Sequence, residues 1–304
     1  MIAKSLFYPC ALLTVASLLS ACGGSSDDST GWTTDSSVSL QFAAVAGTTP
    51  VSCGTTITSL GTGSQSAQVQ DLRFYISDVQ LLKEDGSTTP LTLATNDNNN
   101  YTDGTHNVSL ITLSQAGTGA CTTGTLNSTI QGTAPAGRYV GVTMTLGVPM
   151  SLNHLSSTDA ATPAVLRSDV NPSMSWNWRG GRKFTKIELQ STETGNPVTL
   201  LHLGSTGCVG DPANGVAITG CTAPNRLTLT FANFDPAKQQ IALDVQSLFA
   251  QQNFSVTNSC MSSPTDAGCV SDFAALALNF NPDGTGTGTA IAGQTQTVFK
   301  AMSR

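Results

Sequence analysis

Apolar and polar residues alternate in this chain with a period of two, which is the spacing of side chains on one face of a β-strand. The stretch QDLRFYISDVQLL places Leu72, Phe74 and Ile76 on one face, and the alternation resumes at Val79 and Leu81. YVGVTMTLGV and RLTLTF repeat the pattern. Each stretch is therefore predicted to be a strand with one face in the core.

Turn signals such as Asp85-Gly86 and Asp103-Gly104 separate these stretches, and long helical patterns are scarce. PAKQQIALDVQSLFAQQ (236–252) is the best candidate for a short helix. Many strands joined by turns predict an all-β fold, either an antiparallel β-sandwich or an open barrel with long disulfide-stapled loops.

The N-terminus has the pattern of a bacterial lipoprotein signal. Lys4 precedes an apolar run that ends in Leu-Ser-Ala-Cys at Cys22. The run is about 14 residues long, below the roughly 18 to 20 that cross a bilayer. We expect a signal peptide over 1–21, a lipid on Cys22, a Gly/Ser-rich flexible tether over 22–36 and one domain over 37–304.

Removal of Cys10 with the signal and lipidation of Cys22 leave six cysteines, an even number in an exported chain. Neighbours in the sequence suggest two short bridges, Cys208–Cys221 and Cys260–Cys269, and these leave Cys53 to pair with Cys121. Fifteen pairings are formally possible, so this one is a hypothesis. No C-x-x-C motif is present, and thiolate zinc and thioredoxin-type redox sites therefore lack their signature.

The charge excludes one class of partner, and the absent motifs weaken several classes of enzyme. The net charge is −6 and only 11% of residues are charged, so no basic stripe exists to bind nucleic acid. The chain contains no nucleophile elbow, P-loop, H-E-x-x-H or dinucleotide fingerprint.

Two histidines and a tryptophan pair are the remaining candidates for chemistry. His154 follows an alternating strand where the chain turns into a loop, and His202 lies in an apolar run before a glycine turn. Either could be an ordinary buried histidine. In MSWNWRGGRKF, an extended backbone would place Met174, Trp176 and Trp178 on one face, which is otherwise typical of an aromatic core stripe.

The chain resembles the MbnP family, the four-cysteine member of the metallo-mystery pair. Six segments carry the resemblance, in order: DLRFYISDVQLL, GRYVGVTMTLGVPMSLNH, MSWNWRGGRKF, LHLGSTGC, PNRLTLTFANFDP and CMSSPTDAGC. The resemblance implies an exported copper-binding protein of copper homeostasis, encoded beside a di-haem c-type partner of the MbnH/MauG and cytochrome c peroxidase type. The partner oxidises the first tryptophan of W-x-W to kynurenine, and copper binding depends on that change.

Carried onto this sequence, the resemblance makes Trp176 the kynurenine and His154 and His202 the other ligands of one copper, expected as Cu(I). Met174 is a lesser candidate for a further contact. Trp178 is expected to relay the oxidising hole or to pack against the site. The protein would then be the substrate of its partner and not itself an enzyme.

One position departs from the family pattern, and one alternative function stays open. Family members commonly have a tyrosine where this chain has Arg182, which puts in doubt whatever that tyrosine contributes to partner docking.

The lipid would be the only membrane contact, and it would hold the domain at the outer membrane, facing the periplasm or the cell surface. The alternative is an adhesive or glycan-binding lipoprotein in which Trp176 and Trp178 form a stacking platform.

Overall fold

The computed structural model describes residues 31–176 and 181–304. The expected signal peptide over 1–21, the lipidated Cys22 and Trp178 lie outside the described residues. Within the described residues no helix is long and apolar enough to cross a bilayer. Residues 32–34, the end of the expected tether, form strand β1 and pair with β11, so folded structure begins before residue 37.

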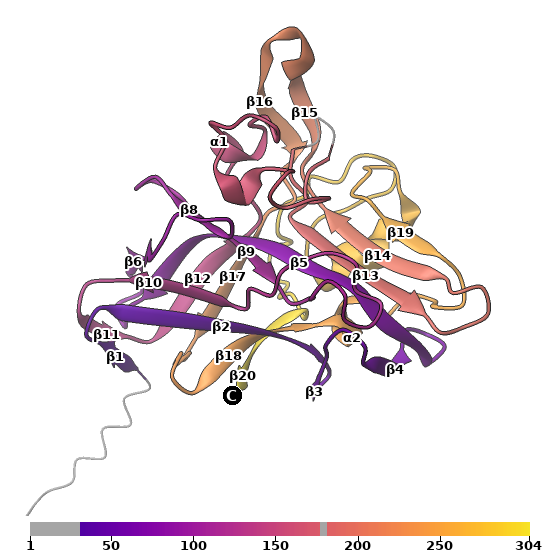
Figure 1. Ribbon diagram of the computed structural model, residues 1–304, viewed down its shortest axis with the longest axis horizontal. Helices are drawn as coiled ribbons and strands as arrows, with labels where there is room; N and C mark the ends of the chain where they lie inside the picture. Colours follow the sequence, from indigo (N-terminus) through magenta and orange to yellow (C-terminus); the bar gives the residue numbers. More distant parts are fainter. Residues whose placement is uncertain (1–30, 177–180) are drawn as a thin grey trace, which may run out of the picture. The chain divides into compact units, whose positions relative to one another are not determined.

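Two larger sheets make up most of the fold (Figure 1). The larger sheet has ten strands: β4 (Thr56–Leu60), β5 (Gln65–Leu82), β6 (Thr88–Pro90), β8 (Asn100–Thr102), β9 (Asn107–Thr112), β12 (Gly141–Leu146), β13 (Thr185–Ser191), β14 (Val198–Leu203), β17 (Leu227–Ala232) and β19 (Asn258–Cys260). The smaller has six: β2 (Ser37–Ala46), β3 (Thr49–Pro50), β7 (Thr92–Leu93), β10 (Thr129–Thr133), β18 (Gln239–Asp244) and β20 (Phe299–Ser303).

Most strand pairs are antiparallel, but β14 pairs with β19 and β18 pairs with β2 in parallel. Two short antiparallel pairs complete the β-structure: β1 (Trp32–Thr34) with β11 (Gly137–Tyr139), and β15 (Thr206–Asp211) with β16 (Val216–Ala223). In Figure 1 the β15–β16 hairpin projects from the sheets beside the short helix α1 (Met150–Asn153). The predicted all-β fold is confirmed, as an open arrangement of mixed sheets.

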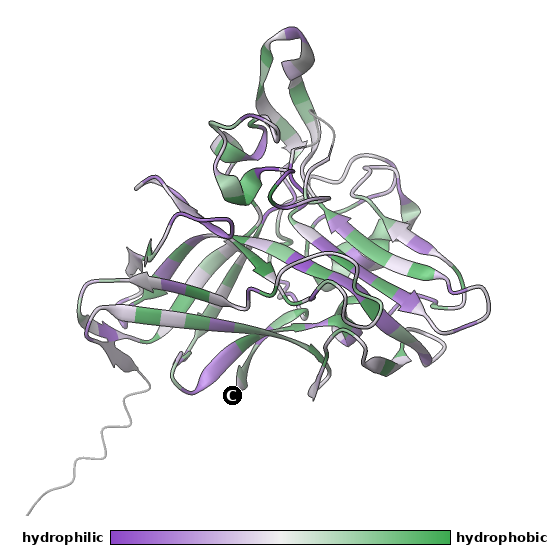
Figure 2. Cartoon of the chain, viewed as in Figure 1, coloured by the Kyte–Doolittle hydropathy of each residue, from purple (hydrophilic) through white to green (hydrophobic). Residues whose placement is uncertain are grey.

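The two larger sheets bury a common core. Phe42 of β2, Phe74 of β5 and Phe299 of β20 meet edge to face, with ring centroids 5.9 and 5.4 Å apart. Figure 2 shows the alternation of hydrophobic and hydrophilic residues along the strands. Burial of these faces supplies the main driving force for folding, because apolar area leaves water.

Strand β5 organises the larger sheet and contains the change of phase seen in its sequence. It pairs along its length with β4, β6, β9, β12 and β13. Asp78 has a left-handed backbone, with φ 52°, and the register with β12 shifts beside it. This bulge returns Val79 and Leu81 to the buried face, as the resumed alternation predicted.

The helices are short: α1 (Met150–Asn153), α2 (Val245–Leu248), α3 (Val270–Ala275), and the 3₁₀ turns η1 (Ala164–Leu166), η2 (Pro212–Asn214) and η3 (Ala267–Cys269). The helix predicted within 236–252 is wrong over its first half. That half is strand β18, which lies between β2 and β20, and only Val245–Leu248 is helical. The Asp244 side chain caps this helix by accepting from the backbone N–H groups of Gln246 and Ser247.

The three expected disulfides are all confirmed: Cys53–Cys121, Cys208–Cys221 and Cys260–Cys269. They differ in their surroundings. Cys53, Cys121, Cys260 and Cys269 are at most 9% exposed, whereas Cys208 and Cys221 are half-buried on the hairpin.

One face of the larger sheet buries a cluster of charged side chains. In the antiparallel register, Lys186 of β13 lies opposite Arg73 of β5 and His202 of β14, and Glu188 lies opposite Asp71. Directly paired residues share a face, so these five side chains meet. Asp71 is fully buried and accepts hydrogen bonds from Arg73 at 2.7 and 2.8 Å and from Lys186 at 2.8 Å.

We predict that Asp71→Asn destabilises the fold strongly. It leaves the buried Arg73 without its counter-charge and removes one of the two carboxylates that pair with Lys186, and removing one partner of a buried ion pair costs about 3–5 kcal/mol. Urea unfolding followed by circular dichroism measures the loss. Asp169→Asn is the matched control, because the Asp169 carboxylate is 66% exposed beside Arg167. It should unfold at the urea concentration of the wild type, and equal midpoints for both variants would contradict the prediction.

A second prediction concerns pH. Burial raises the pKa of Asp272 in α3 to about 7, against the hydrogen bonds from Gln252 and Ser271. The folded state therefore holds a proton that the unfolded chain loses near pH 4, and this contribution to stability falls as pH rises through about 7. Asp272→Asn has no such loss. At pH 8 it should exceed the wild type by about 4 kcal/mol, an advantage that disappears at pH 4. Urea unfolding across this range measures the difference, and parallel profiles would refute it.

Candidate metal centre

His154 lies where its sequence context suggested, directly after the strand and the short turn that follows it. Strand β12 leads to α1, and His154 is the C-terminal capping residue of this helix. The Nε2 atom of its imidazole is 3.0 Å from Asn153 Nδ2, an amide nitrogen that can only donate. Nε2 is also 3.5 Å from Cys221 Sγ and 3.8 Å from Cys208 Sγ. The histidine therefore contacts the disulfide of the projecting hairpin.

Arg182 fixes the backbone around His154. Its guanidinium is buried and donates to the carbonyl oxygens of Asn153 at 2.7 Å, of Leu155, and of Leu166 at 2.8 and 3.1 Å. Arg182 N also donates to Asn153 Oδ1 at 2.9 Å. The sequence showed Arg182 only as a departure from the family's tyrosine; in the structure its side chain is buried and donates to the backbone on both sides of His154.

Trp176 lies on one arm of a short antiparallel turn. Ser175 bridges to Arg182, and Trp176 N donates to the Gly181 carbonyl at 2.8 Å. Gly181 has φ 70°, a conformation that favours glycine. Trp178 and the other residues of 177–180 lie outside the described residues. Met174, the lesser candidate for a metal contact, is fully buried in the hydrophobic core.

The Trp176 indole lies between His154 and His202. It lines a cavity of about 370 Å³ together with His154. Its ring also meets the His202 imidazole edge to face, with centroids 5.9 Å apart. Gly204 permits this approach, because a Cβ at that position would lie 2.6 Å from the indole nitrogen. Trp176 therefore lies near both candidate histidines, lining a cavity with His154 and contacting the ring of His202.

His202 is oriented by a buried carboxylate. Its Nε2 lies 2.7 Å from Glu188 Oε1, and Glu188 also accepts from Lys186 Nζ at 2.8 Å. Burial opposes ionisation of Glu188, but hydrogen bonds from His202 and Lys186 outweigh it and lower its pKa to about 2. An ionised carboxylate only accepts, so His202 Nε2 carries the proton of this hydrogen bond.

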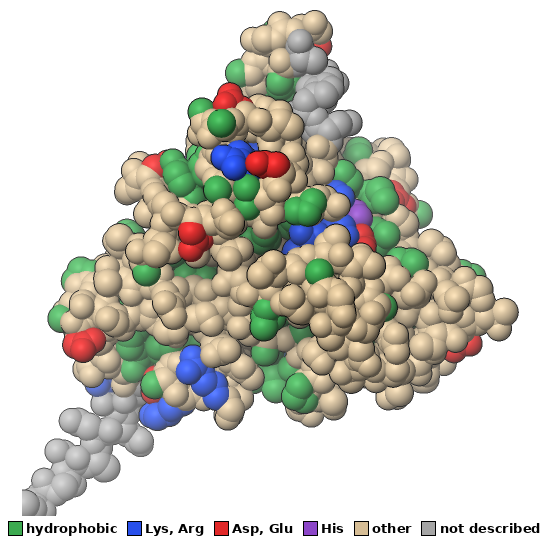
Figure 3. Space-filling model, viewed as in Figure 1, with side chains coloured by type: hydrophobic (Ala, Val, Ile, Leu, Met, Phe, Trp, Pro, Cys, Tyr) green, Lys and Arg blue, Asp and Glu red, His purple; other side chains and the backbone are tan. Residues whose placement is uncertain are grey.

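The other ring nitrogen of His202, Nδ1, therefore carries a lone pair that can bind a metal. Burial lowers the pKa of His202 despite the hydrogen bond to Glu188, which favours the neutral ring. Its Nδ1 is buried and has no hydrogen-bond partner among the described residues. A carboxylate that fixes the tautomer of a histidine is the usual outer support of a metal-binding imidazole. Figure 3 shows a histidine beside positive and negative side chains on an otherwise sparsely charged surface.

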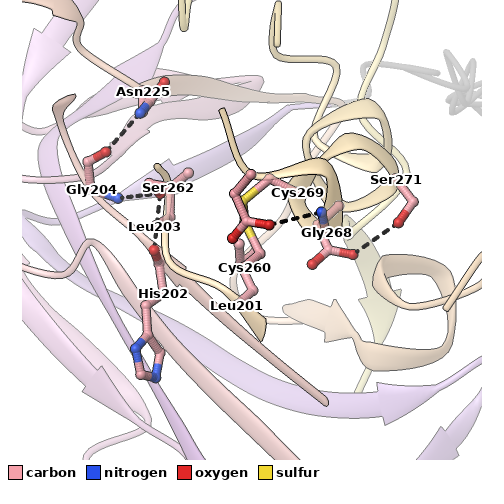
Figure 4. The surroundings of a disulfide bond; sticks show 12 residues. Leu201, His202, Leu203, Gly204, Asn225, Cys260, Ser262, Gly268, Cys269 and Ser271 are labelled. Atoms are coloured by element: carbon pink, nitrogen blue, oxygen red, sulfur yellow. Dashed lines mark hydrogen bonds between the residues drawn. A yellow bond between two sulfur atoms is a disulfide. The ribbon is translucent and has the colours of Figure 1, made fainter. Parts of the chain in front are cut away.

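The backbone of His202 is held from the opposite side. Ser262 Oγ donates to the His202 carbonyl at 2.9 Å and accepts from Gly204 N at 3.1 Å, and Asn225 Nδ2 donates to the Gly204 carbonyl at 2.7 Å. Figure 4 shows these bonds beside the Cys260–Cys269 disulfide, with the imidazole pointing away from it. The end of β14 is therefore fixed before any ligand is present.

One cation lies over the indole. Lys183 Nζ is 4.9 Å from the centre of the Trp176 ring, and burial lowers the pKa of this lysine. The contact covers part of the indole face.

Sequence reasoning missed Lys183, Glu188 and Arg182, because their roles follow from strand register and not from a motif. One indication was available from the sequence: Lys186 and Glu188 are two positions apart, so on a strand they lie on the same face.

Comparisons with known proteins identify the family of this chain. The family model MbnP matches residues 35–262. The solved structure of MbnP from Methylosinus trichosporium is similar at 31% sequence identity, with a TM-score of 0.75, and the match covers 88% of this chain and 98% of that one. Comparison with curated proteins gives no match. The chain belongs to the MbnP family.

Proposed function

We propose that this protein binds one copper ion, as Cu(I), through His154, His202 and residue 176 after its indole has been oxidised to kynurenine. The observation that carries the proposal is the position of Trp176, which shares a cavity with His154 and contacts the ring of His202. Membership of the MbnP family supports it.

The donor set fits such an ion only after the indole has changed. Indole nitrogen donates a hydrogen bond and is a poor ligand. Kynurenine has an aromatic amine and a ketone, both able to coordinate. The buried Nδ1 of His202 is a ready imidazole ligand, and Cu(I) accepts nitrogen ligands in low coordination numbers.

The setting of the proposed function follows from the N-terminus and the family. A lipid on Cys22 would tether the copper-binding domain to the outer membrane, facing the periplasm or the cell surface. A di-haem MbnH/MauG-like partner would supply the oxidising equivalents for Trp176. The protein would serve copper homeostasis as the substrate of that partner and not as a catalyst.

The alternative, a stacking platform for sugars, requires an accessible indole face. Trp176 is half-buried, Lys183 lies over its ring and the His202 ring packs against it. These contacts favour a site assembled around the indole over a surface that receives a flat ligand.

The decisive experiment compares protein produced with and without the di-haem partner. With the partner, the peptide containing Trp176 should gain the mass difference between tryptophan and kynurenine, and the protein should hold one copper per chain. Without it, both changes should be absent. Peptide mass spectrometry and elemental analysis measure the two quantities.

Variants of the proposed ligands complete this test. His154→Ala and His202→Ala should each abolish copper binding in the co-produced protein while the kynurenine still forms. His106→Ala is the control, because His106 pairs with Asp78 in a different part of the sheet. An unmodified Trp176 after co-production with an active partner, or copper retained in the double histidine variant, would refute the proposal.

A further prediction concerns Glu188. In Glu188→Gln the neutral amide can donate to His202 Nε2, and this reverses the tautomer and protonates Nδ1. Loss of such an outer hydrogen bond typically weakens metal binding about 10- to 100-fold. Competition with a Cu(I) chelator measures the affinity of co-produced protein. Glu84→Gln, at a glutamate whose side chain is 79% exposed, should keep wild-type affinity. Equal affinity in both variants would show that Glu188 has no such role.

A further inference from the structure

The Cys208–Cys221 disulfide lies against a histidine nitrogen. Cys208 in β15 is the direct cross-strand partner of Cys221 in β16. His154 Nε2 is 3.8 Å from one sulfur and 3.5 Å from the other. The three ligand atoms all lie within 4.8 Å of one another. No other trio of His, Cys, Asp and Glu among the described residues meets this criterion.

This disulfide is also the one that a reductant can reach most easily. Cys53, Cys121, Cys260 and Cys269 are buried at 9%, 2%, 1% and 0% exposure, whereas Cys208 and Cys221 are half-buried. Strands β15 and β16 form a separate two-stranded sheet, so opening their bond breaks no ladder of the two larger sheets. Thiol–disulfide exchange depends on access to the sulfur atoms, and this bond offers that access.

We propose that reduction of Cys208–Cys221 converts this corner of the protein into a second metal site, in which both thiolates and His154 Nε2 bind Cu(I). The reductant is a protein dithiol or small thiol. A thiolate of the reductant attacks one sulfur to form a mixed disulfide, and a second thiol, from the same dithiol or from another small-thiol molecule, attacks that bond and releases the protein with both cysteines reduced. Two electrons and two protons pass to the cysteines while the reductant becomes a disulfide. Cu(I) then displaces the two thiol protons.

The distances suit a single metal ion. Metal–sulfur bonds of about 2.3 Å and metal–nitrogen bonds of about 2.0 Å place nitrogen and sulfur roughly 3.5 to 3.8 Å apart at tetrahedral or trigonal angles. The observed separations of 3.5 and 3.8 Å already match this range. Soft thiolates with one imidazole form a donor set that selects Cu(I).

His154 can turn its lone pair to a metal at small cost. Asn153 Nδ2 donates to His154 Nε2 at 3.0 Å, and the same amide lies 3.5 Å from Ser205 Oγ. The Asn153 amide therefore still has Ser205 Oγ as an acceptor when a metal takes its place at His154 Nε2. Backbone anchoring by Arg182 holds His154 beside the hairpin in both states.

The second site uses neither Trp176 nor His202, so it does not require the kynurenine. It shares His154 with the site proposed above. In the reduced protein the two sets of ligands therefore compete for this imidazole.

The test uses the protein produced without the di-haem partner, with Trp176 intact. A water-soluble phosphine reduces it gradually, and peptide mass spectrometry of alkylated cysteines follows each bridge. Cys208 and Cys221 should become reactive first. After removal of the phosphine, anaerobic titration with Cu(I) against a chelator should show one more copper per chain than in the oxidised protein. X-ray absorption should detect sulfur ligands, and bound Cu(I) should protect these two cysteines from alkylation.

Variants identify the ligands. Cys208→Ser with Cys221→Ser, and separately His154→Ala, should lose the additional copper, while His106→Ala should keep it. Equal copper in reduced and oxidised wild type, earlier reduction of either buried bridge, or alkylation unaffected by Cu(I) would overturn the inference. These wild-type readouts hold even if the serine variant does not fold. Failure of the kynurenine site appears separately, in oxidised protein produced with the partner.

Discussion

The Asp71 carboxylate is the interaction on which the larger sheet depends. It is fully buried, and an ionised carboxylate removed from water is tolerated only when cations and hydrogen bonds surround it. Arg73, Lys186 and Thr123 all donate to it, and these residues come from strands β5 and β13 and from a connecting loop. A slip of one residue in either strand would separate these charges, so the cluster fixes the register of the sheet.

The same register determines the chemistry of the candidate site. Lys186 links the buried Asp71 to Glu188, and Glu188 sets the tautomer of His202. The imidazole is therefore oriented by groups that also hold the fold together. Arg182 does the same for His154, through backbone carbonyl oxygens instead of charged side chains. The residue proposed for oxidation lies between two histidines that are fixed independently.

Much of the fold could be predicted from the sequence, because strand alternation and its shift at Asp78 are local properties. The disulfide pairing followed from short spacings in two cases and from elimination in the third. The stretch 236–252 was misread, because Ile241 and Leu243 fit a buried strand as well as a helix and their pairing with β2 is distant in sequence. Resemblance to a family suggested the histidines and Trp176, but Arg182, Lys183 and Glu188 depended on register that no single segment reveals.

The anchoring of His202 by Ser262 has a consequence for the timing of assembly. The two residues are 60 positions apart, and residue 262 is synthesised after the whole of β14. The neighbouring segment is closed by the Cys260–Cys269 bridge, whose formation needs oxidising conditions. A chain that ends before residue 262 thus lacks the hydroxyl that holds the His202 backbone beside the indole. The histidine beside the indole is therefore positioned only after the segment around residue 262 has been made and has folded against β14.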